Sequence, residues 1–422
     1  MDKMKIRGGK PLTGTVQAGG AKNAALPILL SSLLSEEKCT YRNVPILKDI
    51  ETSVELLKTM GCETSLDAVG RSVTVKASAS QIRSYEAPYD LVRKMRASVV
   101  VLGPMLARFG HAKVSLPGGC AIGARPIDLH LKGLERLGAK IELEQGYVIA
   151  SSSKLHGNRV VFDFPSVGAT ENVMMAAALA RGESILENCA REPEIVDLAR
   201  ARRGMGAEIE GEGTETIRIQ GKDSLSGCDH AIMADRIEAG TFLSAAFITG
   251  GDVTVTGIDP EFLEAVLEKF EDAGAKITRG VNSIRLESLG KRPIGTDVTT
   301  KPFPGFPTDM QAQFLSVMCI AEGASVVTET IFENRFMHVP ELARMGADIT
   351  IRGNSAMVRG VKELKGAPVM ATDLRASASL ILAALAAEGE SVVSRIYHLD
   401  RGYERMEDKL KSLGAQIERV SG

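Results

Sequence analysis

One short motif recurs six times along the chain and restricts the folds that the chain can adopt. In each copy a glycine stands between the apolar end of a helical pattern and a strand-like pair, as in Leu137-Gly138-Ala139-Lys140-Ile141 and Met345-Gly346-Ala347-Asp348-Ile349. Neighbouring copies are 68 to 77 residues apart, and the six glycines are Gly61, Gly138, Gly206, Gly274, Gly346 and Gly414. The repeat predicts six structural units of about 70 residues each.

The residues around each glycine predict the elements of one unit. Before Gly274, the apolar residues Val266, Leu267 and Phe270 are three and four positions apart, which is typical of a helix with one buried face. Glycine at the helix end accepts a left-handed conformation, and a short strand follows. An earlier and almost wholly apolar segment, such as 173–180, predicts a helix buried on every side. Each unit is therefore expected to run strand–helix–strand–helix–strand–strand.

The period leaves two arrangements open, a single solenoid of six units or two domains of three. Units of about 70 residues are long for a solenoid, whose repeats typically span 20–50 residues. Two domains of about 200 residues suit usual domain sizes better, and a division near residues 229–235 places three motifs on each side. The strand expected within residues 3–16 precedes the first apolar helix and is available to complete a sheet of the second half. We therefore predict an α/β chain with two three-unit domains.

Composition excludes several classes of function. A net charge of −2 argues against nucleic acid or an anionic membrane as the main partner, and aromatic residues at 4% without Trp argue against stacking on bases. The six cysteines include no C-x-x-C pair, so neither a zinc site nor a disulfide framework is indicated, which suits a reducing cytosol. The N-terminus lacks the apolar segment of a signal peptide, and no run of 18 apolar residues could span a bilayer. We expect a cytoplasmic protein.

The sequence also lacks the common cofactor motifs. Neither G-x-x-x-x-G-K-[ST] nor G-x-G-x-x-G follows a predicted strand, so neither ATP nor a dinucleotide is indicated. The six histidines are dispersed and form no cluster with metal-ligand spacing. We expect no metal and no other cofactor.

Residues 113–130 place a cysteine on a glycine-rich loop. A strand-like start gives way to Pro117-Gly118-Gly119, Cys120 follows at once, and Arg125-Pro126 is typical of a helix start. A nearby cation and a helix N-terminus both lower the pKa of a thiol. A single cysteine is most often a small buried apolar residue, but these neighbours favour an exposed, functional thiol.

Three further segments place a charged residue near the start of an apolar helix. Lys22-Asn23 follows two glycines and suits an anion site, although the motif read alone is more typical of a domain hinge with a solvated lysine. Arg96 enters the apolar helix of the second unit. The prolines and glycine of the loop 303–307 are stiff enough to aim the carboxylate of Asp309, whereas Thr308 or Asp309 would also serve simply as a helix cap.

Acidic and basic residues stand close together in three later loops, at Glu333 and Arg335, at Asp373 and Arg375, and at Asp400 and Arg401. Each pair alone is typical of a surface ion pair, which contributes little to stability. The basic residues of both halves nevertheless come from equivalent loop ends. They predict a cationic cleft between the domains for a ligand with several negative charges, with the members Lys22, Arg96, Arg125, Arg335, Arg375 and Arg401.

The motifs closely resemble those of the enolpyruvyl transferases that act on UDP-N-acetylglucosamine. The resemblance extends over essentially the whole chain, from Gly-Gly-Ala-Lys-Asn-Ala-Ala at 19–25 to Asp-Arg-Gly-Tyr-Glu at 400–404. The segments 116–129, 303–311 and 333–340 resemble that family specifically, and not only its fold. The resemblance implies a two-domain inside-out α/β barrel of six βαβαββ units, three per domain. Residues 22–233 would form the first domain with the Cys120 loop, residues 1–21 and 234–422 the second, and the active site would lie in the cleft between them.

The same resemblance implies an activity and a set of roles. The enolpyruvyl group of phosphoenolpyruvate would move to the 3′-hydroxyl of UDP-N-acetylglucosamine with release of phosphate, the first committed step of peptidoglycan synthesis. In this addition–elimination, Cys120 would be the acid, the carrier of a covalent adduct and the target of fosfomycin, and Asp309 would be the base. The implied phosphoenolpyruvate contacts are Lys22, Asn23, Arg125 and Arg401. The implied nucleotide-sugar contacts are Arg96, Arg125, Pro126, Ile127, Asp128, Leu129, Ser166, Val167, Gly168, Asp309 and Ile331. The partners would be these two small molecules, and the sequence does not indicate an oligomeric state.

Two alternatives and one departure accompany this hypothesis. The shikimate-pathway enolpyruvyl transferase has the same fold, but its phosphate and shikimate loops are not recognisable here, and it uses no loop thiol like Cys120. A ligand-binding relative without turnover belongs to another class, and nothing in the sequence requires it. The departure is Arg202-Arg203-Gly204, which replaces a more helix-friendly approach to the third motif and puts the local helix, not the site, in doubt.

Overall fold

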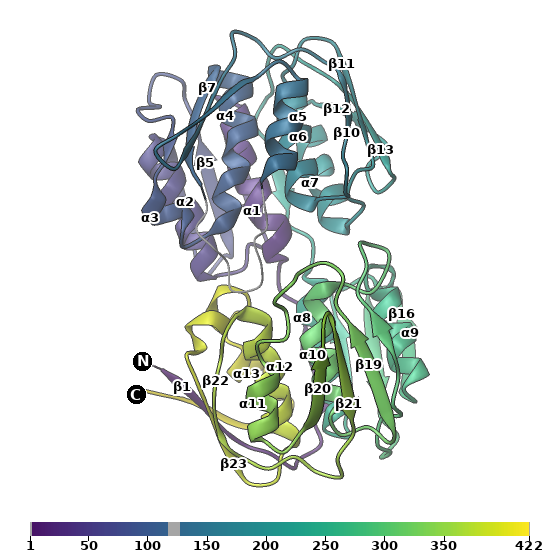
Figure 1. The fold of residues 1–422 in the computed structure, drawn as a ribbon. Helices are drawn as coiled ribbons and strands as arrows, with labels where there is room; N and C mark the ends of the chain where they lie inside the picture. The colour runs from purple at the N-terminus through teal and green to yellow at the C-terminus, as the bar shows by residue number, and fades with distance from the viewer. Residues whose placement is uncertain (1, 117–126, 422) are drawn as a thin grey trace. The chain divides into compact units, whose positions relative to one another are not determined.

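The structure, a computed structural model, describes residues 2–116 and 127–421 and divides into two domains (Figure 1). The first domain consists of the described residues of Gly20–Gly119 and Pro126–Met233. The second domain consists of the described residues of Met1–Gly19 and Ala234–Gly422. Each domain has its own cluster of buried apolar side chains.

The described part of the first domain contains three sheets and a set of helices. Its strands are β3 (Lys38–Arg42), β4 (Glu63–Asp67), β5 (Ser72–Lys76), β6 (Glu86–Ala87), β7 (His111–Ser115), β8 (Lys140–Glu144), β9 (Tyr147–Ser151), β10 (Arg159–Val161), β11 (Glu183–Glu187), β12 (Glu208–Glu210), β13 (Thr216–Gln220) and β14 (Asp229–Ala231). Its α-helices are α1 (Lys22–Leu30), α2 (Lys48–Met60), α3 (Tyr89–Val92), α4 (Leu102–Phe109), α5 (Asp128–Arg136), α6 (Val167–Ala177) and α7 (Pro193–Gly204), with the 3₁₀ segments η1 (Ser31–Leu34) and η2 (Arg96–Val101). The strand orders are β14-β3-β5-β4, β6-β7-β9-β8 and β10-β11-β13-β12.

The second domain repeats this plan. Its strands are β1 (Lys3–Arg7), β2 (Thr13–Gln17), β15 (Asp252–Thr256), β16 (Lys276–Gly280), β17 (Ser283–Glu287), β18 (Val298–Thr299), β19 (Ala324–Thr328), β20 (Asp348–Arg352), β21 (Ser355–Arg359), β22 (Pro368–Met370), β23 (Glu390–Ser394) and β24 (Gln416–Val420). Its helices are α8 (Arg236–Ile248), α9 (Glu264–Asp272), α10 (Gln311–Met318), α11 (Val339–Arg344), α12 (Leu374–Ala386) and α13 (Met406–Ser412), with η3 (Pro260–Leu263), η4 (Thr308–Met310) and η5 (Ile396–Arg401). The strand orders are β22-β23-β1-β24, β16-β17-β15-β2 and β18-β19-β21-β20.

All six sheets have one topology, in which one edge pair of strands is parallel and the other pairs are antiparallel. In one sheet β18 pairs with β19 in parallel, while β19, β21 and β20 pair antiparallel. The first strands of the chain complete two sheets of the second domain, because β1 lies between β23 and β24 and β2 pairs with β15. The prediction of an α/β fold with six repeated units, three per domain, is confirmed.

The six motif glycines end their helices as the sequence predicts. Their φ angles lie between 92° and 105°, in the left-handed region where residues with a Cβ are strained. Through Gly274, for example, the chain leaves α9 and enters β16 directly. One residue type at one position therefore fixes the helix-to-strand turn in every unit.

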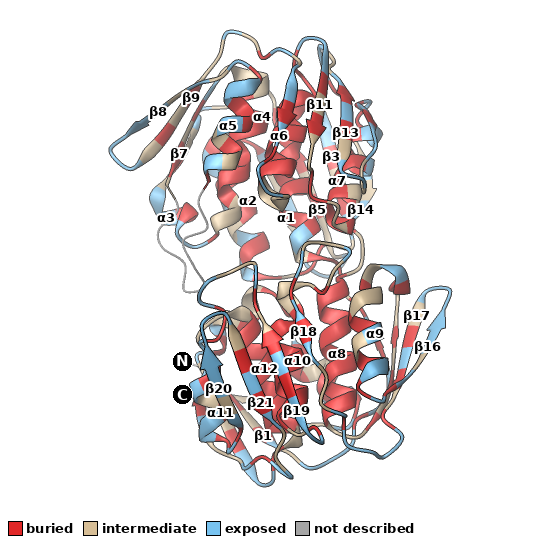
Figure 2. Cartoon of the chain, turned by 45° about the vertical axis from the view of Figure 1, so that its right-hand side comes forward, coloured by how far each residue is buried: buried red, intermediate tan, exposed pale blue. Residues whose placement is uncertain are grey.

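The two helix classes also differ as predicted. All 13 residues of α8 and all 8 residues of α10 are buried, and α8, α10 and α12 pack against one another inside their sheets (Figure 2). In contrast, α9 buries only Val266, Leu267 and Phe270 and exposes its other face. A helix that is apolar on every side must be covered by other protein elements. This explains why α8, α10 and α12 lie inside the sheets, whereas α9 keeps one exposed face.

The helix α7 departs from the expectation for its sequence. It continues without a break from Pro193 to Gly204, so Arg202 and Arg203 do not interrupt it. Arg202 is completely buried (0% exposed), although a charged side chain on a second helix was expected to face water.

Candidate active site

The predicted site residues lie in both domains, and three lie outside the described residues. Those in the first domain are Lys22, Asn23, Arg96, Ile127, Asp128, Leu129, Ser166, Val167 and Gly168. Those in the second domain are Asp309, Ile331 and Arg401. Cys120, Arg125 and Pro126 lie outside the described residues.

Lys22 starts α1 and forms a largely buried ion pair. Its Nζ lies 2.6 Å from Oδ2 of Asp49, a residue of the first turn of α2, and the two side chains are only 12% and 5% exposed. Asn23, the next residue, is exposed. The sequence did not reveal Asp49 as a partner, because the helical pattern of α2 gives no sign that one of its acids turns inward.

The predicted nucleotide-sugar residues of the first domain cluster at the starts of helices. Arg96 begins η2, Ile127 precedes α5 and Asp128 begins it, and Ser166 caps α6 by accepting a hydrogen bond from the amide of Ala169 at 3.4 Å. Unpaired backbone N–H groups at helix starts favour anions. The chemistry of these positions therefore suits a diphosphate.

The buried side chain of Asn172 forms hydrogen bonds to η2, α4 and α5. Its side-chain amide accepts a hydrogen bond from the Gly103 amide at 2.6 Å and donates to the Val99 carbonyl at 3.2 Å and to His130 Nδ1 at 3.1 Å. A Cβ on Gly168 would stand 3.0 Å from the His130 ring, so α5 and α6 approach closely there because residue 168 is glycine. Asn172 is completely buried, and its role was not predicted.

Asp309 is held by two of the arginines that the sequence predicted to lie in a cationic cleft. Arg335 Nη2 donates to its Oδ1 at 2.9 Å and Arg375 Nη2 donates to its Oδ2 at 2.7 Å. The arginine side chains are 5% and 6% exposed, against 26% for the carboxylate. The alternative of surface ion pairs is therefore excluded for Arg335 and Arg375, because both guanidinium groups turn inward to Asp309.

The two guanidinium charges control the ionisation of Asp309. Burial alone would raise the pKa of its carboxyl, but Arg375 and Arg335 outweigh burial and hold that pKa well below the ordinary value. Burial lowers the pKa of Arg375, yet the charge of Asp309 reverses this and the net pKa is raised. Asp309 is therefore a carboxylate at neutral pH, with the charge state that a base needs.

A network of buried hydrogen bonds holds the Arg375 guanidinium in place. Arg375 Nη1 donates to the Tyr403 hydroxyl at 3.2 Å, and this hydroxyl lies 2.8 Å from Thr241 Oγ1. Gln313 Nε2 donates to the backbone oxygen of Asp309 at 2.9 Å and to Thr241 Oγ1 at 3.2 Å. The guanidinium and the carboxylate are thus fixed by α8, α10 and α12.

Glu329, directly after β19, positions the loops on either side of Asp309 and was not predicted. Its Oε2 accepts a hydrogen bond from Thr308 at 2.8 Å. Its Oε1 accepts from Thr300 Oγ1 at 2.9 Å and from the amide of Ile331 at 2.8 Å. Glu329 is 2% exposed, so this side chain is one buried support for both η4 and Ile331.

Arg401 and His338 are two further titratable residues of the second domain. Arg401 ends η5 and is partly exposed, and its sequence neighbour Asp400 pairs with Arg419 at 2.6 Å. His338 is 1% exposed, and burial together with Arg335 lowers its pKa to about 4 against the opposing charge of Asp373. His338 is therefore neutral at physiological pH.

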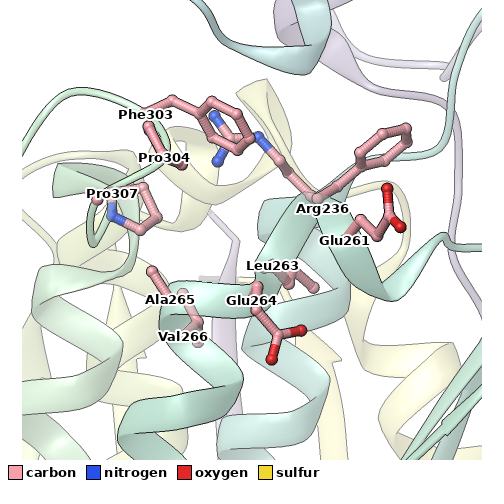
Figure 3. A pocket seen from close by; sticks show the side chains of 11 residues that line it. Arg236, Glu261, Leu263, Glu264, Ala265, Val266, Phe303, Pro304 and Pro307 are labelled. Carbon is pink, nitrogen blue, oxygen red and sulfur yellow. The ribbon is translucent and has the colours of Figure 1, made fainter.

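A small pocket of the second domain is lined in part by the loop that precedes Asp309. Figure 3 shows the side chains of Arg236 and Phe303 next to each other, with Pro304 and Pro307 beside Phe303. The Arg236 guanidinium lies over the Phe303 ring, 5.6 Å from its centroid. None of the predicted site residues lines this pocket, so it is separate from the carboxylate–arginine cluster.

Two searches over the described residues found no further site. No group of three or more His, Cys, Asp or Glu side chains in residues 2–116 and 127–421 could hold a metal ion. Over the same ranges, none of the helices has both the length and the apolar character needed to cross a bilayer.

Comparisons with known proteins place these residues in context. The family described as "EPSP synthase (3-phosphoshikimate 1-carboxyvinyltransferase)" matches residues 6–410. UDP-N-acetylglucosamine 1-carboxyvinyltransferase of Nitratidesulfovibrio vulgaris (strain DP4) is 61% identical over 419 residues, covering 99% of both chains. The enzymes of the same name from Geobacter metallireducens and Shewanella woodyi are 58% and 57% identical, covering 100% of both chains.

Solved structures give the same result for the fold. The enolpyruvyl transferase NikO from Streptomyces tendae superposes with a TM-score of 0.90 at 25% identity, covering 100% of this chain and 99% of that one. EPSP synthase from Acinetobacter baumannii superposes with a TM-score of 0.77 at 19% identity, covering 100% of both chains.

Proposed function

Because the chain belongs to the EPSP synthase family of carboxyvinyltransferases, we propose how its own residues perform the transfer. The chain is an enzyme that moves the enolpyruvyl group of phosphoenolpyruvate to UDP-N-acetylglucosamine with release of phosphate, a step of peptidoglycan synthesis. The observation that carries this conclusion is an identity of 57–61% over 99–100% of the chain to enzymes named for that substrate.

Cationic residues of both domains bind the substrates. The phosphate and carboxylate of phosphoenolpyruvate together carry about three negative charges. Lys22 and Asn23 of the first domain, Arg125, and Arg401 of the second domain bind these groups. The ion pair of Lys22 with Asp49 supports this role, since it holds the ammonium group in one place before the ligand arrives.

The nucleotide sugar lies along the helix starts of the first domain. Arg96, residues 125–129 and residues 166–168 contact it, with Ile331 and Asp309 contributing from the second domain. The starts of α5 and α6 support this proposal, because their backbone N–H groups favour the diphosphate and Gly168 lets the two helix starts lie close together.

Asp309 takes the proton of the 3′-hydroxyl. Its carboxylate is ionised beside Arg335 and Arg375, but a carboxylate paired with two guanidinium groups is a weak base. An anionic substrate that draws either arginine toward itself raises the pKa of Asp309 and strengthens it as a base. Asp309 would then be an effective base only while phosphoenolpyruvate is bound.

Cys120 supplies the proton to the C3 carbon of the enol. Protonation makes C2 electrophilic, and the 3′-oxygen, losing its proton to Asp309, attacks C2 to give a tetrahedral intermediate. Loss of a C3 proton and of phosphate then restores the double bond. General acid–base catalysis of this kind contributes about 10²–10⁴ in rate. The same thiol also forms a covalent adduct with phosphoenolpyruvate and accepts fosfomycin.

A paired-substrate assay tests this function. Phosphate release from phosphoenolpyruvate is measured with UDP-N-acetylglucosamine and, separately, with shikimate 3-phosphate. We expect release with the nucleotide sugar alone. Release with shikimate 3-phosphate alone would support the activity in the family's description, and binding of the nucleotide sugar without release would identify a non-catalytic relative. We place this reaction in the cytoplasm, in keeping with six cysteines that suggest no disulfide framework.

A further inference from the structure

Arg202 on α7 carries a buried charge and has no carboxylate partner among the described residues. Its Nη1 donates to the Ser31 carbonyl at 3.0 Å and contacts the Met205 sulfur, whereas Nε and Nη2 have no hydrogen-bond partner within the described chain. Its side chain is 0% exposed. A guanidinium group remains charged at any physiological pH, and burying it without a counter-ion is strongly unfavourable. The surroundings of Arg202 must therefore supply a negative charge.

Two cysteines lie beside this guanidinium on neighbouring strands. Cys39 is in β3, and Cys228 immediately precedes β14. The strands pair in parallel with Thr40 opposite Asp229, and the Thr40 amide donates to the Cys228 carbonyl at 2.7 Å. The register thus puts Cys39 and Cys228 opposite each other, one position earlier.

The spacing and exposure of the two thiols suit a covalent link. Neighbouring strands are about 4.7–4.9 Å apart, inside the 4.4–6.8 Å range of Cα separations in disulfides. Neither thiol is in a disulfide, and Cys39 Sγ lies 4.0 Å from the Glu37 carbonyl oxygen. Cys39 is completely buried while Cys228 is partly exposed, so a small reagent can reach one sulfur of the pair.

The charged state of the pair differs from that of the other buried thiols. The hydrogen bond from Cys228 lowers the pKa of Cys39 to about 6 against the effect of burial, and the Arg202 charge and Tyr41 lower it further. The pKa of Cys228 is raised, because it keeps the proton that the two sulfurs share. Burial raises the pKa to about 12 for each of the remaining buried thiols, which are Cys62, Cys189 and Cys319.

We propose that Cys39 and Cys228 form a redox-active dithiol whose single shared negative charge neutralises Arg202, and that a small-molecule disulfide oxidises it to an intramolecular disulfide. This site is independent of enolpyruvyl transfer.

The oxidation proceeds by two exchanges. The shared proton first passes from Cys228 to Cys39. The Cys228 sulfur, now a thiolate, attacks one sulfur of the small disulfide, whose S–S bond breaks and releases one thiolate. Cys39, deprotonated in turn, attacks the Cys228 sulfur and expels the second small thiolate. The pair loses two electrons and its one proton, and the small disulfide becomes two thiols after protonation by that proton and by solvent.

Oxidation also removes the counter-ion of Arg202. The disulfide is neutral, so the charge of Arg202 favours the reduced form, just as stabilising a thiolate makes any disulfide easier to reduce. Arg202 therefore has two opposite effects, since it speeds the reaction of the thiols and weakens the disulfide that they form.

The test uses the full chain with Cys120→Ser, which removes the other reactive thiol. The protein is incubated with oxidised glutathione, and peptides are mapped without reduction. We expect one linked pair containing Cys39 and Cys228, a loss of two hydrogen masses, and no change at Cys62, Cys189 or Cys319. In the matched variant Cys39→Ser, Cys228 should stop at a mixed disulfide with glutathione.

Two Arg202 variants separate charge from packing. Arg202→Leu should slow alkylation of Cys228 at neutral pH about tenfold or more and shift the dithiol–disulfide equilibrium toward the disulfide, whereas Arg202→Lys should keep the wild-type behaviour. If Arg202→Leu does not fold, the peptide maps of wild type and Cys39→Ser after incubation with oxidised glutathione decide whether the proposal holds. The proposal is overturned if the pair stays unmodified like the other buried cysteines, or if folded Arg202→Leu reacts as fast as wild type.

Discussion

At the scale of single residues, the site consists of opposite charges that are buried together. Asp309 joins Arg335 and Arg375, which are 26 and 66 positions away in the sequence. The sequence is compatible with two arrangements of these arginines, a cationic cleft or local surface pairs with Glu333 and Asp373. Only packing turns them inward, and Asp373 instead caps α12 by accepting hydrogen bonds from the amides of Arg375 and Ala376.

Cys120 gives the most direct prediction at this scale. Cys120→Ala should lower kcat by at least about 100-fold, because it removes the proton donor, and it should abolish covalent modification by fosfomycin. Cys120→Asp should keep activity while escaping the drug, since a carboxylic acid donates a proton but presents no sulfur nucleophile. Phosphate release and intact-mass spectra measure both effects. Cys189→Ala, a buried thiol elsewhere, is the control, and wild-type turnover in Cys120→Ala would refute the acid role.

His338 predicts a pH dependence of stability. Its pKa is about 4 in the folded chain and about 6.5 when unfolded, so between these values the unfolded state binds more protons. The free energy of unfolding should therefore fall as the pH is lowered from 6.5 to 4, by up to about 1.4 kcal/mol per pH unit from this group. Urea unfolding at a series of pH values measures the slope.

The variant His338→Gln should lose this contribution to the slope. His111, which is exposed on β7, provides the matched control His111→Gln, which should keep the wild-type slope. Equal slopes in wild type and His338→Gln would show that the buried imidazole does not control acid stability.

At the scale of elements, the loops that follow the strands carry the site, and buried side chains fix them. Glu329 joins the end of β18 through Thr300, η4 through Thr308, and the segment after β19 through Ile331. A charged acceptor can take all these hydrogen bonds at once, because a carboxylate offers only acceptor positions. In the sequence, Glu329 is only an acidic residue that follows a strand. Most acidic residues at such positions face water, so its role could not be predicted.

Glu329→Gln should therefore disturb the site without removing any group proposed to contact substrate. The side-chain NH₂ of the glutamine would face groups that donate hydrogen bonds to Glu329. Each buried donor left without an acceptor lowers stability by about 1–3 kcal/mol. We expect kcat to fall by about one to two decades, with a smaller change in KM for phosphoenolpyruvate, and Asp309 to titrate differently in the pH–rate profile. Glu333→Gln, at an exposed position of the same loop, is the control. An unchanged kcat and profile would exclude a positioning role for Glu329.

At the scale of the whole molecule, two domains with the same plan each have their own core. Residues of both domains are proposed to contact one pair of substrates, so ligand binding should draw the domains together. Small-angle scattering should show a smaller radius of gyration after UDP-N-acetylglucosamine is added. UDP-glucose is the control ligand, and identical profiles with and without UDP-N-acetylglucosamine would contradict closure.

The sequence by itself determined the architecture of this protein. A glycine that needs positive φ, an apolar first helix and a half-apolar second helix recur in every unit, and each depends on local conformation or on the periodicity of burial. Motif resemblance also identified the family and its chemistry. The division between inner and outer helices, the six sheets and Asp309 as a residue of interest were therefore predictable.

Tertiary structure alone decided which charged groups are buried and with whom. Lys22 with Asp49, Asp309 with two arginines, Glu329 at three loops, and Arg202 beside two thiols each join residues from separate elements. A charged side chain follows the same sequence pattern whether it faces water or a buried partner. The difference lies in the desolvation of the charge and in the counter-ion that offsets it, and both exist only once the elements have packed.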